Sequence, residues 1–134
     1  MTLTESSIYI GLKKLGDKLY SIKYLMDKSD RILMAETIFD IHAQVMIHYS
    51  NAFLDPISRK DELKKAIGYF AVLRDRIDFC VRHKIIHFTN TRGAYDDWTK
   101  LTKVELYEII AQIDNDMLKW YGSLNKSQTI IVCR

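Results

Sequence analysis

The sequence predicts an all-α protein, an antiparallel up-and-down four-helix bundle, from three observations. Apolar residues recur every three or four positions in four separate segments, the spacing that gives a helix one apolar face. The 134 residues include five Gly and one Pro, too few for the frequent turns of an all-β fold. Most links between the segments are short, and four such helices bury their apolar faces most simply against one another.

The length fits one domain, which we expect to span residues 1–128, followed by a short tail over 129–134. A chain of this size buries roughly two thirds of its unfolded surface, so it needs no metal or disulfide to fold. No apolar run approaches the ~18 residues of a membrane span. The first residues lack the parts of a signal peptide, so we expect a cytoplasmic protein in which Cys80 and Cys133 stay reduced.

The first two predicted helices are separated by a polar turn. The apolar positions of the first helix are Ile8, Leu12, Leu15, Leu19, Ile22 and Met26. Those of the second helix are Met34, Ile38, Ile41, Val45 and Ala52, widened by Phe39, Met46 and Phe53. The side-chain oxygens between Asp27 and Asp30 are typical of a helix start, and we expect Ser29 or Asp30 to cap the second helix.

The last two predicted helices follow a proline turn and a longer connection. Pro56 ends the second helix, because it disfavours a helical conformation at Asp55, and Ser58 is then placed to cap the third. The apolar positions of the third helix are Leu63, Ala66, Ile67, Phe70, Leu73, Ile77, Cys80 and Val81. Those of the fourth are Leu106, Ile109, Ile110, Ile113, Met117, Trp120 and Leu124.

Two further segments lack a clear helical period. Residues 88–98 combine Gly, Asn, Asp and aromatic residues, and we favour packing of this loop over a helix end rather than a binding contact. The run Thr129 to Cys133 is apolar and β-prone. It is either frayed or docked on the bundle or on a neighbouring subunit.

Charge is unevenly distributed along the chain, although the net charge is only +3. Residues 29–55 carry one basic and four acidic residues, whereas residues 56–92 carry nine basic and four acidic residues. A positive face that neutralises phosphates is one interpretation, and an ordinary solvated face partly balanced by Asp75 and Asp78 is the other. The candidate nucleic-acid contacts are Arg59, Lys60, Lys64, Lys65, Arg74, Arg76, Arg82 and Lys84.

We expect neither a catalytic site nor a cofactor-binding site in this chain. Cys80, His83 and His87 have a spacing that would place a thiolate and two imidazoles along one helix face, as zinc requires. However, Cys80 belongs to the apolar stripe, and no acidic residue completes a tetrahedral set. The chain also lacks a Glu-x-x-His pair, a phosphate-binding glycine loop and a G-x-S-x-G motif. We therefore predict a protein that is not an enzyme and has no cofactor.

Three collinear stretches carry a resemblance to a known family. The first is Leu19-Tyr20, then Lys28-Ser-Asp-Arg31, then Glu36 and Ile38, which is similar to a pattern L-Y … P-K-S-x-R … Q/E-x-I. Asp27 stands at the position of the pattern's proline. The second is Leu73-Arg74, which is similar to the start of L-R-F-x-x-R, with Asp75 and Asp78 replacing the aromatic residue and the second arginine.

The third stretch covers residues 108–126 and is similar to E-x-I-x-E-I-G-R-M-L-G-G-W-I-K-S-L. Trp120, Ser123 and Leu124 are in register with that pattern, whereas Leu118-Lys119 replaces its glycine pair. Together, the three stretches span about residues 8–126. On these residues, the chain resembles the accessory variability determinant (Avd) proteins of diversity-generating retroelements. That family lies within the bacterial four-helix-bundle proteins related to rRNA intervening-sequence proteins.

The resemblance implies a non-catalytic accessory protein that assembles as a barrel-like homo-oligomer, a homopentamer. Its partners would be a reverse transcriptase and nucleic acid, either template RNA or cDNA, and its role would be to support mutagenic cDNA synthesis. The alternative is a bundle of the rRNA-intervening-sequence type, or a general interaction module, without a polymerase partner. Of the eight candidate contact residues, Arg74 lies in one of the matched stretches.

Overall fold

The structure is a computed structural model that describes the backbone of residues 1–88 and 103–132 and the side chains up to residue 125. Helices are the only regular secondary structure in these two ranges, which contain no strand. The prediction of an all-α protein with four long helices is therefore confirmed for the described part of the chain. No helix within it is both long enough and apolar enough to cross a lipid bilayer.

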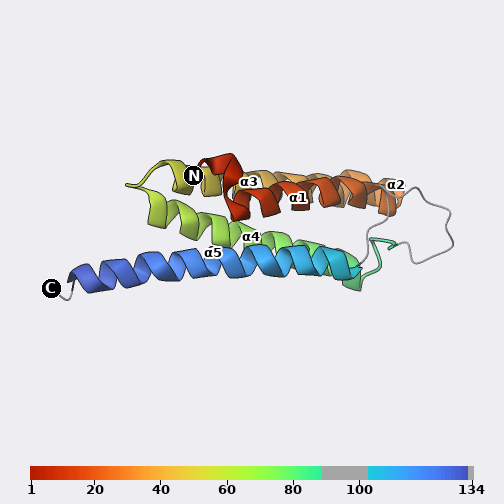
Figure 1. Cartoon of the computed structure of the whole chain (residues 1–134). Helices are drawn as coiled ribbons and strands as arrows, with labels where there is room; N and C mark the ends of the chain where they lie inside the picture. The colour runs from red at the N-terminus through yellow and green to blue at the C-terminus, as the bar shows by residue number, and fades with distance from the viewer. Residues whose placement is uncertain (89–102, 133–134) are drawn as a thin grey trace.

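Four long helices are joined by short helical turns. The long helices are α1 (Ser7–Ile22), α3 (Glu36–Leu54), α4 (Arg59–Arg82) and α5 (Lys103–Val132). The short elements are η1 (Leu3–Glu5), η2 (Lys23–Leu25), α2 (Lys28–Asp30) and η3 (Arg31–Ala35). Successive long helices run in opposite directions (Figure 1). The main neighbours of α1 are α3 and α5, and those of α4 are also α3 and α5, so the hydrophobic core lies between the four helices.

The apolar stripe predicted for the first helix faces this core. All six of its residues are buried, and Leu12 and Leu15 are fully buried. Six of the eight positions predicted for the third helix are buried as well, including Phe70, Leu73 and Ile77. Because an apolar residue every three or four positions keeps one face of a helix turned inward, the periodicity alone identified these core residues.

The second helix begins earlier than predicted and contains an unusual turn. Helical backbone runs without a break from Lys28 through α2, η3 and α3, and η3 is a π-helical turn. Asp27 occupies the cap position without a side-chain cap hydrogen bond, so the prediction that Ser29 or Asp30 caps this helix is wrong. Both of these residues lie inside the first helical turn.

The π turn also changes which residues of α3 are buried. A π turn holds one more residue than an α turn, which shifts the register of all that follows. The buried row of this segment is Ala35, Ile38, Val45, Tyr49 and Ala52. Met34 and Ile41, which the sequence placed in the core stripe, are only partly buried. The predicted stripe therefore begins at Met34, one residue before the buried Ala35. Tyr49 follows Val45 by four positions, so its burial agrees with α-helical spacing although the predicted stripe did not include it.

Two polar contacts join α3 to α1 inside the bundle. The Tyr49 hydroxyl and the Ser6 Oγ form a buried hydrogen bond of 2.6 Å, and Ser6 also accepts the Tyr9 N–H at the start of α1. The His42 Nε2–H donates to the Leu12 carbonyl at 2.9 Å. Burial lowers the pKa of His42 and raises that of Tyr49, and both groups are stabilised in their neutral forms.

Gly16 makes room for the His42 ring. A Cβ atom at Gly16 would lie 3.0 Å from His42 Cε1, which is tighter than most carbon contacts, so the absence of a side chain allows the ring to lie against α1. Gly68, on the exposed face of α4, would have no atom within 4 Å of an added Cβ. These two helical glycines therefore have different roles, and of the two only Gly16 is needed for packing.

The link between α3 and α4 is closed by Asp55. Its carboxylate accepts the Ile57 N–H at 3.0 Å and the Ser58 hydroxyl at 2.7 Å, and these hydrogen bonds lower the pKa of Asp55. Ser58 stands at the start of α4 as predicted, but its side chain makes no cap hydrogen bond to that helix. The prediction of a Ser58 cap is wrong because the hydroxyl is bonded to Asp55 instead.

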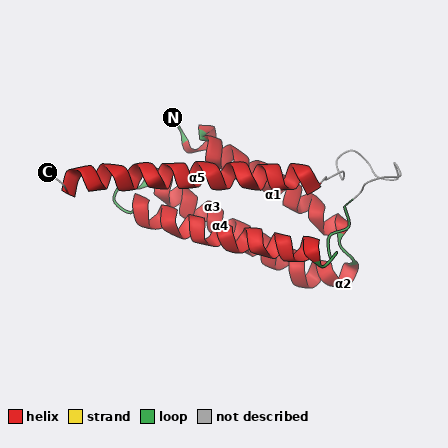
Figure 2. Ribbon diagram, turned by 90° about the horizontal axis from the view of Figure 1, so that it is seen from below, coloured by secondary structure: helices red, strands yellow, loops and turns green. Residues whose placement is uncertain are grey.

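Two segments singled out in the sequence lie wholly or partly outside the described residues. The connection 88–98 lies outside them except for Phe88, which is partly buried against the core. Helix α5 continues through residues 129–132, where the sequence suggested a β-prone tail, and residues 133–134 are outside the described range. Figure 2 shows the C-terminal end of α5 extending beyond the α3–α4 link, as does Figure 1.

Candidate nucleic-acid interface

The eight basic residues proposed as nucleic-acid contacts lie along α4 and just past its end. Lys64 and Arg82 are 18 residues apart, which is five helical turns, so they lie on the same side of α4 roughly 27 Å apart. Lys65 and Arg76 are 11 residues apart and share a different side. The cations are thus spread over two sides of a long helix and do not form one compact patch.

Arg59 is bound to the protein itself. Its Nε donates to the Ala52 carbonyl at 2.8 Å and its second terminal nitrogen donates to the Phe53 carbonyl at 2.9 Å. These carbonyls lie in the last turn of α3 and have no helical partner of their own. The guanidinium carbon also lies 5.8 Å from the ring centre of Trp120. Arg59 therefore joins the end of α3 to α4 and α5.

Arg74 and Arg82 both have carboxylate partners. Arg74 is 3.2 Å from Asp114 on α5, and Arg82 is 2.9 Å from Asp78 one turn earlier on α4. The Tyr107 hydroxyl also donates to Asp78 at 2.8 Å. This hydrogen bond, together with Arg82, lowers the pKa of Asp78. Burial and the same hydrogen bond raise the pKa of Tyr107 to about 12.

Lys65 lies at the edge of a polar contact between α3 and α4. Its Nζ is 3.9 Å from Glu62, which also accepts a 2.5 Å hydrogen bond from His48 Nδ1. The hydrogen bond with His48 is the main cause of the lowered pKa of Glu62. The His48 ring stacks on Tyr69 with ring centres 5.3 Å apart. The Lys65 side chain remains 58% exposed, so it extends into solvent from this network.

The remaining candidate cations differ in exposure. Lys64 and Arg76 are exposed, and neither forms a salt bridge with another described residue. Lys60 is partly buried. Lys84 is exposed and has a left-handed backbone, with φ of 57°, where it ends α4. The Lys84 and Ile85 N–H groups donate to the carbonyls of Val81 and Cys80, the pattern of a Schellman motif.

The cysteine and two histidines do not share a face. Cys80 is buried, and burial raises the pKa of its thiol. His83 is exposed and its ring lies 4.3 Å from that of Phe79. His87 lies beyond the end of α4, near Asp27. Within residues 1–88 and 103–132, no group of three His, Cys, Asp or Glu side chains is arranged to hold a metal ion.

A second group of cations, not singled out in the sequence, lies where α1 ends. Lys23 Nζ is 4.1 Å from the ring centre of Tyr20 and 5.4 Å from that of Tyr24. The Arg31 guanidinium carbon lies 5.8 Å from the Tyr24 ring centre. Distances below about 6 Å are those of cation–π interactions. We name these four residues, Tyr20, Lys23, Tyr24 and Arg31, the tyrosine–cation cluster.

Both tyrosine rings of the cluster are accessible. Tyr20 is 51% exposed and Tyr24 is 40% exposed, and their rings meet edge to face at 5.8 Å. Their hydroxyls form a 3.3 Å hydrogen bond. This bond and the Lys23 charge lower the pKa of Tyr20, whereas the same bond raises that of Tyr24.

Unlike Arg74 and Arg82 of α4, the two cations of the cluster have no carboxylate partner within the described part of the chain. Among the residues that the structure describes, neither Lys23 nor Arg31 forms a salt bridge. Tyr20 and Arg31 both belong to the first stretch of family resemblance, but they are 11 positions apart and in different elements. Their presence in that stretch was the available sequence signal.

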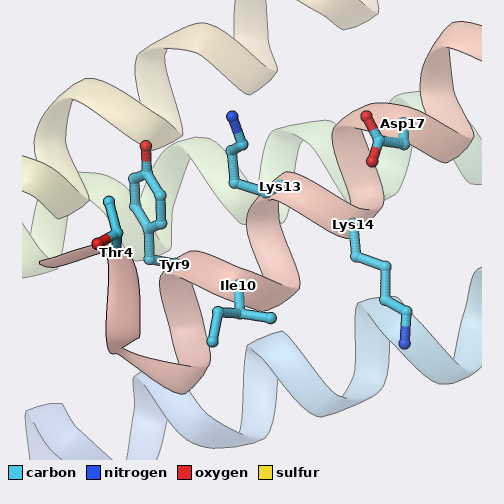
Figure 3. A pocket seen from close by; sticks show the side chains of 6 residues that line it. All are labelled: Thr4, Tyr9, Ile10, Lys13, Lys14 and Asp17. Atoms are coloured by element: carbon cyan, nitrogen blue, oxygen red, sulfur yellow. The ribbon is translucent and has the colours of Figure 1, made fainter.

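Two further lysines, which are adjacent in the sequence, line a hollow on the surface of α1. It is lined by Thr4, Tyr9, Ile10, Lys13, Lys14 and Asp17. Figure 3 shows the Lys13 and Lys14 side chains pointing in opposite directions, Lys13 toward α3 and Lys14 toward α5. Because the two ammonium groups do not converge, the hollow does not form a paired cation site for an anion.

Comparison with protein-family models, with curated proteins and with solved structures gives no match for this chain.

Proposed function

We propose that this chain is a non-catalytic accessory protein of a diversity-generating retroelement. It binds the reverse transcriptase and nucleic acid, either template RNA or cDNA, and supports mutagenic cDNA synthesis. The observation that carries this proposal is the collinear set of three motif stretches over about residues 8–126. Residues 1–128 form the functional unit, an antiparallel up-and-down bundle that assembles as a barrel-like homopentamer.

The helical scaffold supports this proposal in two respects. An accessory protein needs rigid surfaces at fixed spacing, and four long helices around a common core supply them. It also needs accessible positive charge, and Lys64, Lys65, Arg76 and Lys84 are exposed along and just beyond α4. Trp120, in the third motif stretch, packs edge to face on Tyr49 and lies near Arg59, so it helps hold the α3–α4 end of the molecule.

Nucleic-acid binding at two salt concentrations tests the first half of the proposal. Contacts with phosphates release counterions, so affinity for structured RNA or a DNA–RNA hybrid is expected to fall steeply as salt rises. Replacing Lys64, Lys65 and Arg76 together with Gln should make this dependence shallower by about 0.7 to 0.9 for each phosphate that is no longer neutralised. Absence of binding at low salt, both alone and with the cognate polymerase, contradicts the nucleic-acid role.

Oligomeric state and gene neighbourhood test the second half. Light scattering is expected to give the mass of a pentamer, which would repeat the modest monomer charge around a ring. A clean monomer contradicts the ring. A reverse transcriptase gene beside this one supports the retroelement role, whereas a position inside an rRNA operon supports the intervening-sequence alternative.

A further inference from the structure

We propose that the tyrosine–cation cluster is a binding site for single-stranded nucleic acid. In this site, an unpaired base stacks on an exposed tyrosine ring while Lys23 and Arg31 contact the flanking phosphates. The inference rests on the proposed nucleic-acid role and names a surface for it that is distinct from α4. It is carried by the juxtaposition of two exposed rings and two cations without carboxylate partners at the α1–η3 corner.

The rings supply the stacking surface. A base stacks on any aromatic face regardless of its sequence, which is how many proteins hold single strands. Tyr20 and Tyr24 are about half exposed, although large aromatic side chains are often buried. Because the two rings meet edge to face, their planes have different orientations. The interplanar angle of 67° lets successive unstacked bases meet different rings.

The cations supply the phosphate contacts. Lys23 lies above Tyr20 at 4.1 Å and Arg31 lies near Tyr24 at 5.8 Å, so each charge is already beside a ring. Neither is neutralised by a salt bridge with a described residue, and the lowered pKa of Tyr20 reflects in part the Lys23 charge. A backbone phosphate next to a stacked base would therefore find an uncompensated cation within reach.

The backbone around the cluster holds it in place. Tyr20 belongs to α1, Lys23 and Tyr24 belong to η2, and Arg31 is the first residue of the π-helical turn η3. The neighbours Ile22, Leu25 and Met26 are buried in the core, which anchors this corner. π turns occur often at functional sites, because they change the direction of a side chain without ending the helix.

A duplex fits this corner less well than a single strand. Bases in a duplex are stacked on each other and cannot stack on a tyrosine ring, and only unpaired regions expose them. A duplex could use only the two cations, with no contribution from the rings. The cluster therefore favours unpaired RNA or DNA over a helix of either kind.

Fluorescence anisotropy with a short unstructured oligonucleotide, as RNA and as DNA, tests the site in the full chain. Replacing Tyr20 and Tyr24 with Leu is expected to weaken binding about tenfold or more, whereas replacing both with Phe keeps the rings and most of the affinity. An abasic oligonucleotide should bind the wild type weakly and show no further loss with the Leu variant. Persistence of full affinity in the Leu variant would overturn the site.

Salt dependence tests the two cations separately from the rings. In the Lys23→Gln/Arg31→Gln variant, the fall of log affinity with log salt should become shallower by about 1.4, because each single-strand phosphate contact contributes about 0.7 to the slope. Lys119→Gln, which removes one exposed cation from α5, is the matched control and should leave both affinity and slope unchanged. Equal slopes for the double variant and the control contradict the phosphate contacts.

The outcomes separate this inference from the proposed function. Wild-type binding that survives all cluster substitutions removes the site and leaves the retroelement role intact. Loss of reverse transcriptase binding with unchanged oligonucleotide binding reassigns the cluster to a protein partner and also overturns the site. A wild type that binds no nucleic acid at low salt, alone or with the polymerase, contradicts both. Circular dichroism and thermal unfolding of every variant confirm that the fold is retained.

Discussion

Helix α4 and the tyrosine–cation cluster both display basic residues, but their cations have different surroundings. On α4, Arg59, Arg74 and Arg82 are bonded to carbonyl or carboxylate oxygens of the protein. In the cluster, Lys23 and Arg31 lie over aromatic rings and form no salt bridge within the described residues. The region with more basic residues therefore contains several that hold the fold together. Its Lys64 and Arg76, like both cations of the cluster, form no salt bridge with a described residue.

The pKa values of two tyrosines reflect this difference. Burial and the hydrogen bond to the Asp78 carboxylate raise the pKa of Tyr107, beside α4, to about 12. The hydrogen bond with Tyr24 and the positive charge of Lys23 lower the pKa of Tyr20. A count of charges along the sequence assigned the positive surface to residues 56–92, whereas the tertiary contacts show how much of that charge is internally balanced.

The largest expected effect is on stability and comes from Arg59. Replacing Arg59 with Met removes two hydrogen bonds to the end of α3 and the contact with Trp120, and should lower the free energy of unfolding by about 2 kcal/mol. Urea denaturation measures the change. Lys64→Met, which removes an exposed cation from the same helix, should stay within about 0.5 kcal/mol. Similar decreases in both variants would show that Arg59 has no special structural role.

The next effect concerns Tyr107. Tyr107→Phe removes the hydroxyl that donates to Asp78 and should lower the free energy of unfolding by about 0.5 to 1 kcal/mol, since solvent screens this partly exposed pair. A raised pKa favours the protonated hydroxyl in the folded state. The stabilisation is therefore complete below the unfolded pKa of about 10 and is lost as pH rises through about 12. The Phe variant should lack this alkaline loss in denaturation curves.

A smaller effect is expected for the pair that joins α4 to α5. A double-mutant cycle with Arg74→Gln and Asp114→Asn should give a coupling of about 0.5 kcal/mol, because both side chains are partly exposed. High salt should reduce the coupling further. A coupling near zero at low salt would mean that Arg74 is as free to bind a ligand as the cluster cations, and would weaken the contrast between the regions.

The smallest effect on stability is expected in the cluster. Lys23→Gln should change the unfolding curve less than Arg59→Met, Tyr107→Phe or the Arg74→Gln/Asp114→Asn pair, yet it should raise the pKa of Tyr20 toward its ordinary value. Ultraviolet titration of the phenolate band, with Tyr20→Phe to assign the signal, measures the shift. Lys119→Gln should leave the titration unchanged. An unaltered Tyr20 titration in Lys23→Gln would show that the lysine charge does not act on this ring.

The helices and much of the core could be predicted from the sequence. The stripe from Ile8 to Met26 is buried at all six predicted positions, because simple helical periodicity applies along α1. The start of α3 was predicted less well, because the π turn at Arg31–Ala35 breaks that periodicity and Ala35 is buried there instead of Met34. Nothing in the apolar pattern marks a π turn, whose extra residue is accommodated by packing.

The sequence predicted which basic residues belong to the candidate site, but it did not predict their contacts. The basic residues of α4 were identified by counting, yet the partners of Arg59 are carbonyls, which every residue carries and no sequence pattern distinguishes. The cluster was missed because its residues are spread over positions 20 to 31, and Arg31 reaches the Tyr24 ring only after the chain turns between α1 and α3.

The sequence by itself determined the all-α class, the four long helices and the faces that α1 and α4 bury, because these follow from local periodicity and turn residues. Only the tertiary structure decided which cations are bonded within the protein and which lie over tyrosine rings. The physical reason is the separation along the chain between the residues that interact. Helix formation depends on residues three or four positions apart, whereas the state of a charge depends on partners brought close from distant parts of the chain.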